Sequence, residues 1–77
     1  MQTHPSVLYV EKENKEEGKL AIELLNKRGV FYQIIELDDK TVRELTNPLP
    51  QLLDVHGFFP GLDNIEWCTK TFYKNYD

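Results

Sequence analysis

The chain opens with a run of apolar residues, followed by a segment in which apolar residues recur at helical spacing. The run Val7 to Val10 is apolar throughout and β-branched at both ends, which is typical of an interior strand buried on both faces. Asn14 can cap a helix after it, with Glu17 three residues later, and Gly29 can end that helix. The apolar stripe of this helix is Leu20, Ala21, Leu24 and Leu25. The pattern predicts a short strand that leads into an amphipathic helix.

Beyond this helix, short extended segments alternate with turn-forming residues. Phe31 to Leu37 is rich in aromatic and β-branched residues, which predicts a second strand. Thr41 to Thr46 has room for one or two helical turns. Asn47 to Pro50 contains two prolines, which exclude a helix because they remove backbone donors and hold their neighbours extended. Gln51 to Asp54 predicts a third strand.

The last part of the chain predicts a hairpin and a helix. Val55-His56-Gly57 is typical of a tight turn, with Phe58-Phe59 as a short fourth strand. Pro60-Gly61 ends this strand, and Asp63 is the predicted N-cap of the final helix. The apolar positions of that helix are three and four residues apart and are predicted to face the core: Ile65, Cys68, Phe72 and Tyr76.

The predicted order of elements is β-α-β-(short α)-β-β-α, in one domain of residues 1–77. A helical crossover joins the first two strands, so they should be parallel with a right-handed connection. A tight turn joins the last two strands, so they should be antiparallel. The sequence therefore predicts an α/β (α+β) fold with a mixed four-stranded sheet and helices packed on the sheet faces.

Composition narrows the classes of function. A formal net charge of −4 argues against a nucleic-acid partner, because phosphate backbones favour basic surfaces. Cys68 is the single cysteine, which excludes an internal disulfide and fits a reducing compartment. His4 and His56 have no further ligands at metal-binding spacing, so no metal is expected. No segment reaches transmembrane length, so a cytoplasmic protein without a membrane partner is expected.

Several segments, in their order along the chain, resemble the glutaredoxin branch of the thioredoxin fold. Val7-Leu8-Tyr9, followed by Lys12, resembles the first strand of that family and the lysine before its active site. Leu20 to Val30 resembles its first helix, with the LL-x-x-x-GV exit. Leu49-Pro50-Gln51 resembles its T-V-P-Q segment, which implies a cis-proline at Pro50. Gly61-Leu62-Asp63-Asn64 resembles the G-G-x-D-D element at the start of its last helix.

The resemblance also shows what this chain lacks. It places Lys15-Glu16-Glu17-Gly18 on the C-P-Y-C tetrad of the family, so neither active-site cysteine is present. Thiol–disulfide exchange requires a thiolate, which these side chains do not supply. Cys68 is expected in the core, where a free cysteine behaves as a small apolar residue. The segment between Asp39 and Pro48 is shorter than the second helix of the family, so one sheet face could be open, or covered by a partner or a second copy.

In the glutaredoxin family a groove beside the cis-proline holds glutathione. The resemblance maps this groove onto Lys12, Leu49, Pro50, Leu62, Asp63 and Asn64. Lys12 can equally be a solvated lysine and Asp63 a helix cap, while Glu16 and Glu17 disfavour an anionic tripeptide. No cofactor is therefore expected, although glutathione stays open as a ligand.

Together these observations favour a redox-inactive, non-catalytic interaction module with a protein partner in the groove around Leu49-Pro50. Extended peptides can add backbone hydrogen bonds along such a loop without any cysteine. Two alternatives stay open: a divergent glutaredoxin that uses Cys68, and a glutathione-binding protein with a residual thiol–disulfide role. Trp67 or Phe58 would serve as a partner anchor if its ring is exposed.

Overall fold

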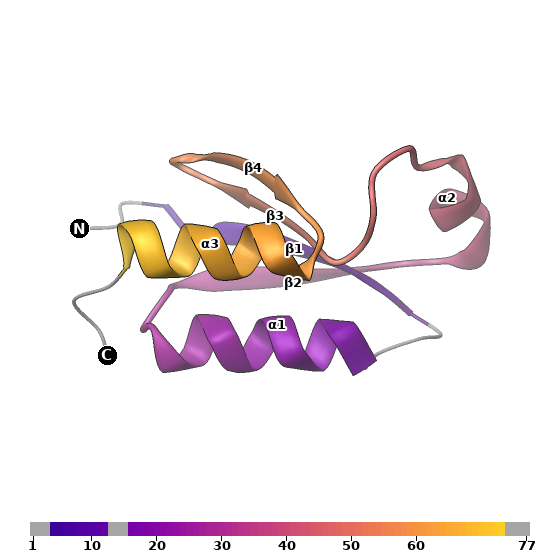
Figure 1. Ribbon diagram of the computed structural model, residues 1–77. Helices are drawn as coiled ribbons and strands as arrows, with labels where there is room; N and C mark the ends of the chain where they lie inside the picture. Colours follow the sequence, from indigo (N-terminus) through magenta and orange to yellow (C-terminus); the bar gives the residue numbers. More distant parts are fainter. Residues whose placement is uncertain (1–3, 13–15, 74–77) are drawn as a thin grey trace.

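The computed structural model describes residues 4–12 and 16–73, which form a small α+β domain with three helices and a four-stranded mixed sheet (Figure 1). The order of elements agrees with the prediction. In chain order they are β1 (Ser6–Glu11), α1 (Glu16–Lys27), β2 (Tyr32–Leu37), α2 (Asp39–Glu44), β3 (Gln51–Asp54), β4 (Gly57–Pro60) and α3 (Leu62–Phe72).

The strands lie in the order β2-β1-β3-β4. β1 is parallel to β2, because α1 carries the chain back to the same end of the sheet. β1 pairs with β3 in antiparallel register, with Leu8 opposite Leu52. The β3–β4 hairpin is also antiparallel, with Leu53 opposite Phe58. The predicted strand directions are therefore confirmed.

Helices α1 and α3 lie side by side and cover the same face of the sheet (Figure 1). Between them and the sheet is a core of fully or nearly fully buried apolar side chains: Leu8, Val10, Ala21, Leu25, Val30, Leu52, Ile65, Cys68 and Tyr73. Burial of this surface is the main source of stability in a domain of this size. The core therefore lies on one side of the sheet.

The opposite sheet face has no helical cover among the described residues. The prediction that β1 is buried on both faces was wrong: Leu8 and Val10 are buried, whereas Val7 and Tyr9 on the other face are half-buried. The helices of the described part of the chain therefore cover one sheet face only, which agrees with the open face expected from the short segment between Asp39 and Pro48. The reason is α2, which has only six residues, buries none of them and lies beyond one end of the sheet.

Two positions in the predicted apolar stripes are exposed. Leu20 is 48% exposed, while Ala21 and Leu25 on the inner side of α1 are fully buried. Phe72 is 41% exposed, and Tyr73 is buried at the end of α3 in its place. The phenol of Tyr73 reaches inward because its hydroxyl group has a buried hydrogen-bond acceptor there.

The predicted cap of α3 was also wrong. The helix begins at Leu62, and Gly61 occupies the N-cap position with a φ of 84°. Glycine suits this left-handed conformation because it has no Cβ. Asp63 therefore lies inside the first turn, where its charge still complements the helix dipole. The predicted cap of α1, Asn14, and the predicted core residue Tyr76 lie outside the described residues.

None of the helices in the described part of the chain is both long enough and apolar enough to cross a membrane.

Candidate functional site

The loop that leads into β3 contains a cis peptide bond between Leu49 and Pro50, as the sequence predicts. Pro50 is buried, and its carbonyl oxygen accepts a hydrogen bond from the N–H of Gly61 at 2.7 Å. This bond ties the loop to the junction between β4 and α3. By contrast, the backbone N–H and C=O of Leu49 have no hydrogen-bond partner among the described residues.

A groove of about 250 Å³ lies in front of this loop. We call it the cis-proline groove. Its walls come from the end of β1, the first turn of α1, α2 and the loop before β3. The lining residues are Val10, Glu11, Glu17, Gly18, Val42, Leu45, Asn47, Pro48, Leu49 and Pro50. The groove therefore joins segments that are about 40 residues apart in the sequence.

The structure brings together only part of the predicted site. Glu17 and Gly18 from the tetrad and Leu49 and Pro50 from the loop line one groove. Glu16 is exposed in the first turn of α1 but does not line it, and Lys15 lies outside the described residues.

The other predicted groove residues lie elsewhere. Lys12 is exposed after β1 and does not line the groove. Leu62 and Asp63 line a separate hollow between α1 and α3. The side-chain amide of Asn64 donates a hydrogen bond to the carbonyl oxygen of Pro60 at 2.6 Å. The residues expected to hold the γ-glutamyl end of glutathione therefore do not share the groove with Leu49.

Gly18 allows α1 to approach the sheet closely. It is buried, and a Cβ atom at this position would lie 3.1 Å from Cγ1 and 3.2 Å from Cβ of Val10. Such distances are shorter than ordinary carbon–carbon contacts of about 3.5–4.0 Å. Gly18 stands at the position that the resemblance assigns to the second cysteine of the tetrad. The side chain of Val10 occupies the space that a Cβ atom would need there.

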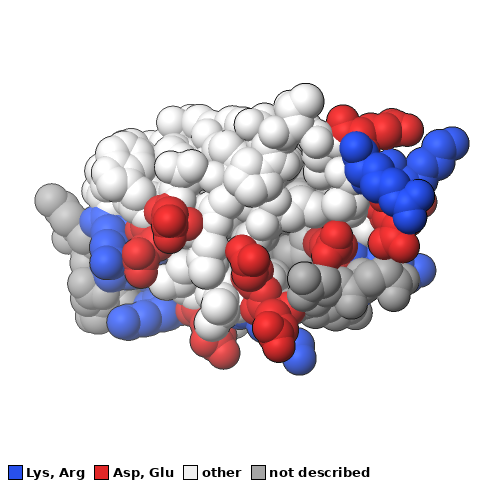
Figure 2. Space-filling view, turned by 45° about the vertical axis from the view of Figure 1, so that its right-hand side comes forward, with Lys and Arg blue, Asp and Glu red and all other residues white. Residues whose placement is uncertain are grey.

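The charge of the groove is negative. Among the described residues that line it, the charged ones are Glu11 and Glu17, without a lysine or arginine. Glu16 adds a further carboxylate to the first turn of α1. Figure 2 shows charged side chains along the lower edge of the molecule, where α1 lies, and at the end that carries α2. Such a groove attracts cationic groups and repels anionic ones.

Cys68 is fully buried on the inner face of α3, as predicted. Burial, together with the nearby negative charge of Asp54, raises the pKa of its thiol to about 12. The reactive thiolate is therefore scarce at neutral pH. Since α3 contributes no residue to the cis-proline groove, this sulfur is also separated from it.

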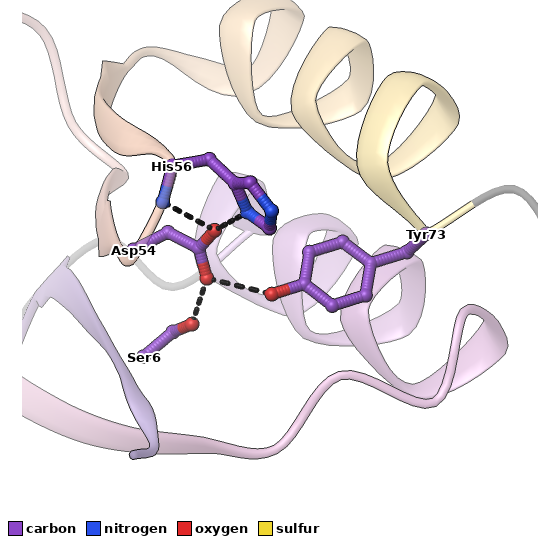
Figure 3. A network of polar contacts seen from close by, with 4 residues as sticks. All are labelled: Ser6, Asp54, His56 and Tyr73. Carbon is purple, nitrogen blue, oxygen red and sulfur yellow. Dashed lines mark hydrogen bonds and ion pairs between the residues drawn. The ribbon is translucent and has the colours of Figure 1, made fainter. Parts of the chain in front are cut away.

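A buried polar network that the sequence analysis missed lies at the other end of β3, around Asp54 (Figure 3). The side chain of Asp54 is fully buried and accepts hydrogen bonds from three others. The hydroxyl group of Ser6 donates to Oδ1, and the hydroxyl group of Tyr73 donates to the same oxygen at 2.9 Å. Nδ1 of His56 lies 2.5 Å from Oδ2. The network therefore joins β1, the β3–β4 turn and the end of α3.

These hydrogen bonds determine the ionisation of the network. Burial alone would raise the pKa of Asp54, but the hydrogen bonds from Ser6, His56 and Tyr73 together lower it below its usual value. Burial and the Asp54 carboxylate raise the pKa of Tyr73. Asp54 is thus held as a carboxylate, and its neighbours act as donors.

The arrangement does not match a Ser-His-Asp catalytic site. In such a site the histidine lies between the acid and the nucleophile, whereas here Ser6 and His56 both contact Asp54 itself. The signal in the sequence is an acidic residue at the end of an apolar strand, with His56 two residues later. Its partners Ser6 and Tyr73 are too distant in the sequence for a local pattern to show.

Aromatic side chains form a surface cluster beside this network. The ring of His56 stacks on Phe72, with centroids 4.0 Å apart, and Trp67 meets Phe72 edge-on at 5.8 Å. Trp67 is 56% exposed, and Phe58, which lies on the other sheet face, is 45% exposed. Both candidate anchors are therefore accessible. No group of residues in the described part of the chain has the composition of a metal site.

Comparisons of the chain with models of protein families, with curated proteins and with solved structures found no match.

Proposed function

We propose that this chain is a redox-inactive, thioredoxin-like domain of glutaredoxin type, and that it acts as a non-catalytic protein-interaction module. Its parallel β1–β2 pair with a helical crossover, its β3–β4 hairpin and the cis-proline before β3 support this description of the fold. In this proposal the cis-proline groove holds an extended segment of a partner protein.

The free backbone groups of Leu49 carry the proposal. An extended peptide that enters the groove can pair with the N–H and C=O of Leu49, as in β-strand addition. The apolar side chains of Val42 on α2 and of Leu45 directly after α2 offer a contact for one residue of that peptide. Specificity in strand addition comes from such side-chain contacts, while the backbone hydrogen bonds supply affinity.

The carboxylates of the groove select the charge of the partner. Glu11 and Glu17 line the same groove as Leu49, so a lysine or arginine of the bound peptide can pair with them. The same carboxylates disfavour glutathione, which carries a net negative charge at neutral pH. The proposed partner segment is therefore extended and carries a basic residue next to an apolar one.

The burial of Cys68 argues against the two redox alternatives. A thiol with a pKa of about 12 has almost no thiolate with which to attack a disulfide. None of the described residues that line the groove contains a sulfur atom. These observations favour binding over catalysis as the role of the groove.

Selection from a library of displayed random peptides tests this function with the full chain as bait. We expect enrichment of peptides that contain lysine or arginine beside an apolar residue. Titration of an enriched peptide should shift the amide resonances of Leu49, Glu17 and Val42. Failure to enrich any peptide above an empty support would refute the proposed function, and so would shifts confined to other parts of the chain.

A charge-reversal pair provides the matched control. Glu17→Lys should weaken binding of the enriched basic peptides at least tenfold, because a cation then replaces a carboxylate in the groove. Glu23→Lys makes the same change on the same helix, but Glu23 lines the hollow between α1 and α3. It should leave binding almost unchanged. Equal losses in both variants would indicate a non-specific charge effect and contradict a role for the groove.

A further inference from the structure

The sheet face opposite α1 and α3, which no helix of the described residues covers, carries apolar side chains on all four strands. We call it the open face. It carries the side chains that point away from α1 and α3. Its apolar members are Val7 and Tyr9 on β1, Ile35 and Leu37 on β2, Leu53 on β3, and Phe58 and Pro60 on β4, and its polar members are Glu11, Gln33 and Gln51. Ile35, Leu53 and Phe58 are 42%, 46% and 45% exposed. Contiguous apolar surface of this kind marks an interaction site in a soluble protein.

The open face is also hollowed. A depression of about 370 Å³ lies beside the half-exposed ring of Phe58, and α2 closes one end of it. Its lining residues are Tyr9, Leu37, Thr41, Leu45, Gln51, Leu53 and Phe58. The ring of Phe58 and the depression that it lines therefore belong to the same surface of one chain.

This face is almost free of charge although the chain is acidic. The register of the strands places a single ionisable carboxylate, Glu11 at the end of β1, among the strand residues of the open face. The formal net charge of the whole chain is −4. In Figure 2 the upper left and upper middle of the molecule show no charged side chains, whereas the upper right, at the end that carries α2, does. The negative charge is therefore carried by other surfaces.

We propose that a second copy of this chain covers the open face in a homodimer. Two acidic chains repel each other unless they meet through neutral surfaces, and the open face is such a surface. A highly charged partner would form few ion pairs with the open face. In a symmetric dimer the same patch meets itself, so the apolar side chains of both copies are covered at once. The two sheets then pack face to face about 10 Å apart, with the helices outside.

The parallel β1–β2 pair favours a second layer of structure on the open face. All-parallel sheets are found almost only with both faces covered, and β1–β2 is the parallel part of this mixed sheet, whose other two strand pairings are antiparallel. Here α1 and α3 cover one face, and the six-residue α2 leaves the other uncovered within the described residues. A second sheet supplies this cover without any additional helix.

The size of the face predicts a weak dimer. Strands about 4.8 Å apart, with a rise of about 3.3 Å per residue, give four strands of this length a projected area of roughly 300 Å². Two such faces together give roughly 600 Å², which is below the roughly 1,200–2,000 Å² of stable interfaces and fits only a weak, transient complex. We therefore expect monomer and dimer to exchange reversibly at micromolar to millimolar concentration.

Sedimentation equilibrium of the full chain tests the proposal over concentrations from about 10 µM to about 1 mM. The average mass should rise with concentration from the 9.1 kDa of one chain towards twice that value. Leu53→Glu and Phe58→Glu should each keep the mass at that of one chain throughout, because each places a charge in the interface. Circular dichroism checks that both variants are folded.

Leu20→Glu is the matched control, because Leu20 on α1 is 48% exposed and lies away from the open face. This variant should dimerise like the parent chain. A parent chain that stays monomeric up to the highest concentration would overturn the proposal, as would dimers of both open-face variants. Loss of dimers in Leu20→Glu would also overturn it. The proposed peptide binding is separate, because neither Leu53 nor Phe58 lines the cis-proline groove.

Discussion

Tyr73 donates its phenolic hydrogen to the buried carboxylate of Asp54, with 2.9 Å between Oη and Oδ1 (Figure 3). The contact joins the end of α3 to the end of β3. Asp54 is fully buried, and a buried carboxylate is stable only when hydrogen bonds replace its lost hydration. The bond therefore serves both to satisfy Asp54 and to fix the last turn of α3 on the sheet.

Tyr73→Phe removes this donor and keeps the ring. The free energy of unfolding should fall by about 2 kcal/mol, which is typical of a hydrogen bond to a charged group. Tyr32→Phe is the control, because the Tyr32 hydroxyl donates to the neutral side chain of Asn26 at an exposed site. Its cost should stay near 0.5 kcal/mol. Urea unfolding measures both values, and equal costs would contradict a special role for Tyr73.

The pH dependence of stability should report on Asp54. Its pKa is lower in the folded chain than the ordinary value of about 3.9, so the folded state favours the ionised form. The stabilisation is complete above the ordinary pKa and is lost as the pH falls through the lower pKa of the folded state. Stability should therefore decline from about pH 4 downward.

Asp54→Asn isolates this contribution. The variant should be less stable than the parent at pH 7, and the difference between them should shrink as the pH falls below about 4. Asp38 also has a lowered pKa, through its capping hydrogen bonds to Thr41, but it is fully exposed. The Asp38→Asn variant should keep most of the parent chain's loss of stability below about pH 4. A constant difference between Asp54→Asn and the parent at every pH would show that Asp54 does not titrate as expected.

The order of the elements could be predicted because each has a local signal. Apolar runs, helical spacing and turn residues gave the seven elements and the directions of the strands. No local sequence pattern indicates on which face of the sheet a helix packs, because the packing face depends on the length of the chain between the strands. Leu20 and Phe72 show the same limit: both fit a helical stripe, yet each lies at the margin of a one-sided core.

The candidate site could be predicted only where its residues are close together in the sequence or where the resemblance maps them. Pro50 and Leu49 lie next to each other in the sequence, and Glu17 and Gly18 were placed opposite them through the resemblance. The hydrogen bond between Ser6 and Asp54 spans 48 positions of the sequence. No local pattern encodes such a pair, since only the packed sheet determines which strand ends meet.

Gly18→Ala tests the close contact between α1 and β1. Alanine favours helices by about 1 kcal/mol over glycine, but its Cβ would lie 3.1 Å from Cγ1 of Val10. Overpacking costs about 1–3 kcal/mol, so the variant should be less stable despite its helix propensity. In a Val10→Ala background the same change should become stabilising. A double-mutant cycle from urea unfolding measures this coupling, and the absence of coupling would contradict the contact.

Cys68 should be inert towards thiol reagents in the native chain. A pKa of about 12 leaves roughly one thiol in ten thousand ionised at pH 8, and full burial also blocks the approach of a reagent. A chromogenic aromatic disulfide should therefore react with the native protein only as fast as the chain unfolds, and at once in concentrated urea. Tyr73→Phe should speed the native reaction, because it lowers the free energy of the opening that exposes the sulfur. Rapid reaction of the native parent chain would instead reveal an accessible thiolate, and the redox alternative would then replace the proposed binding role.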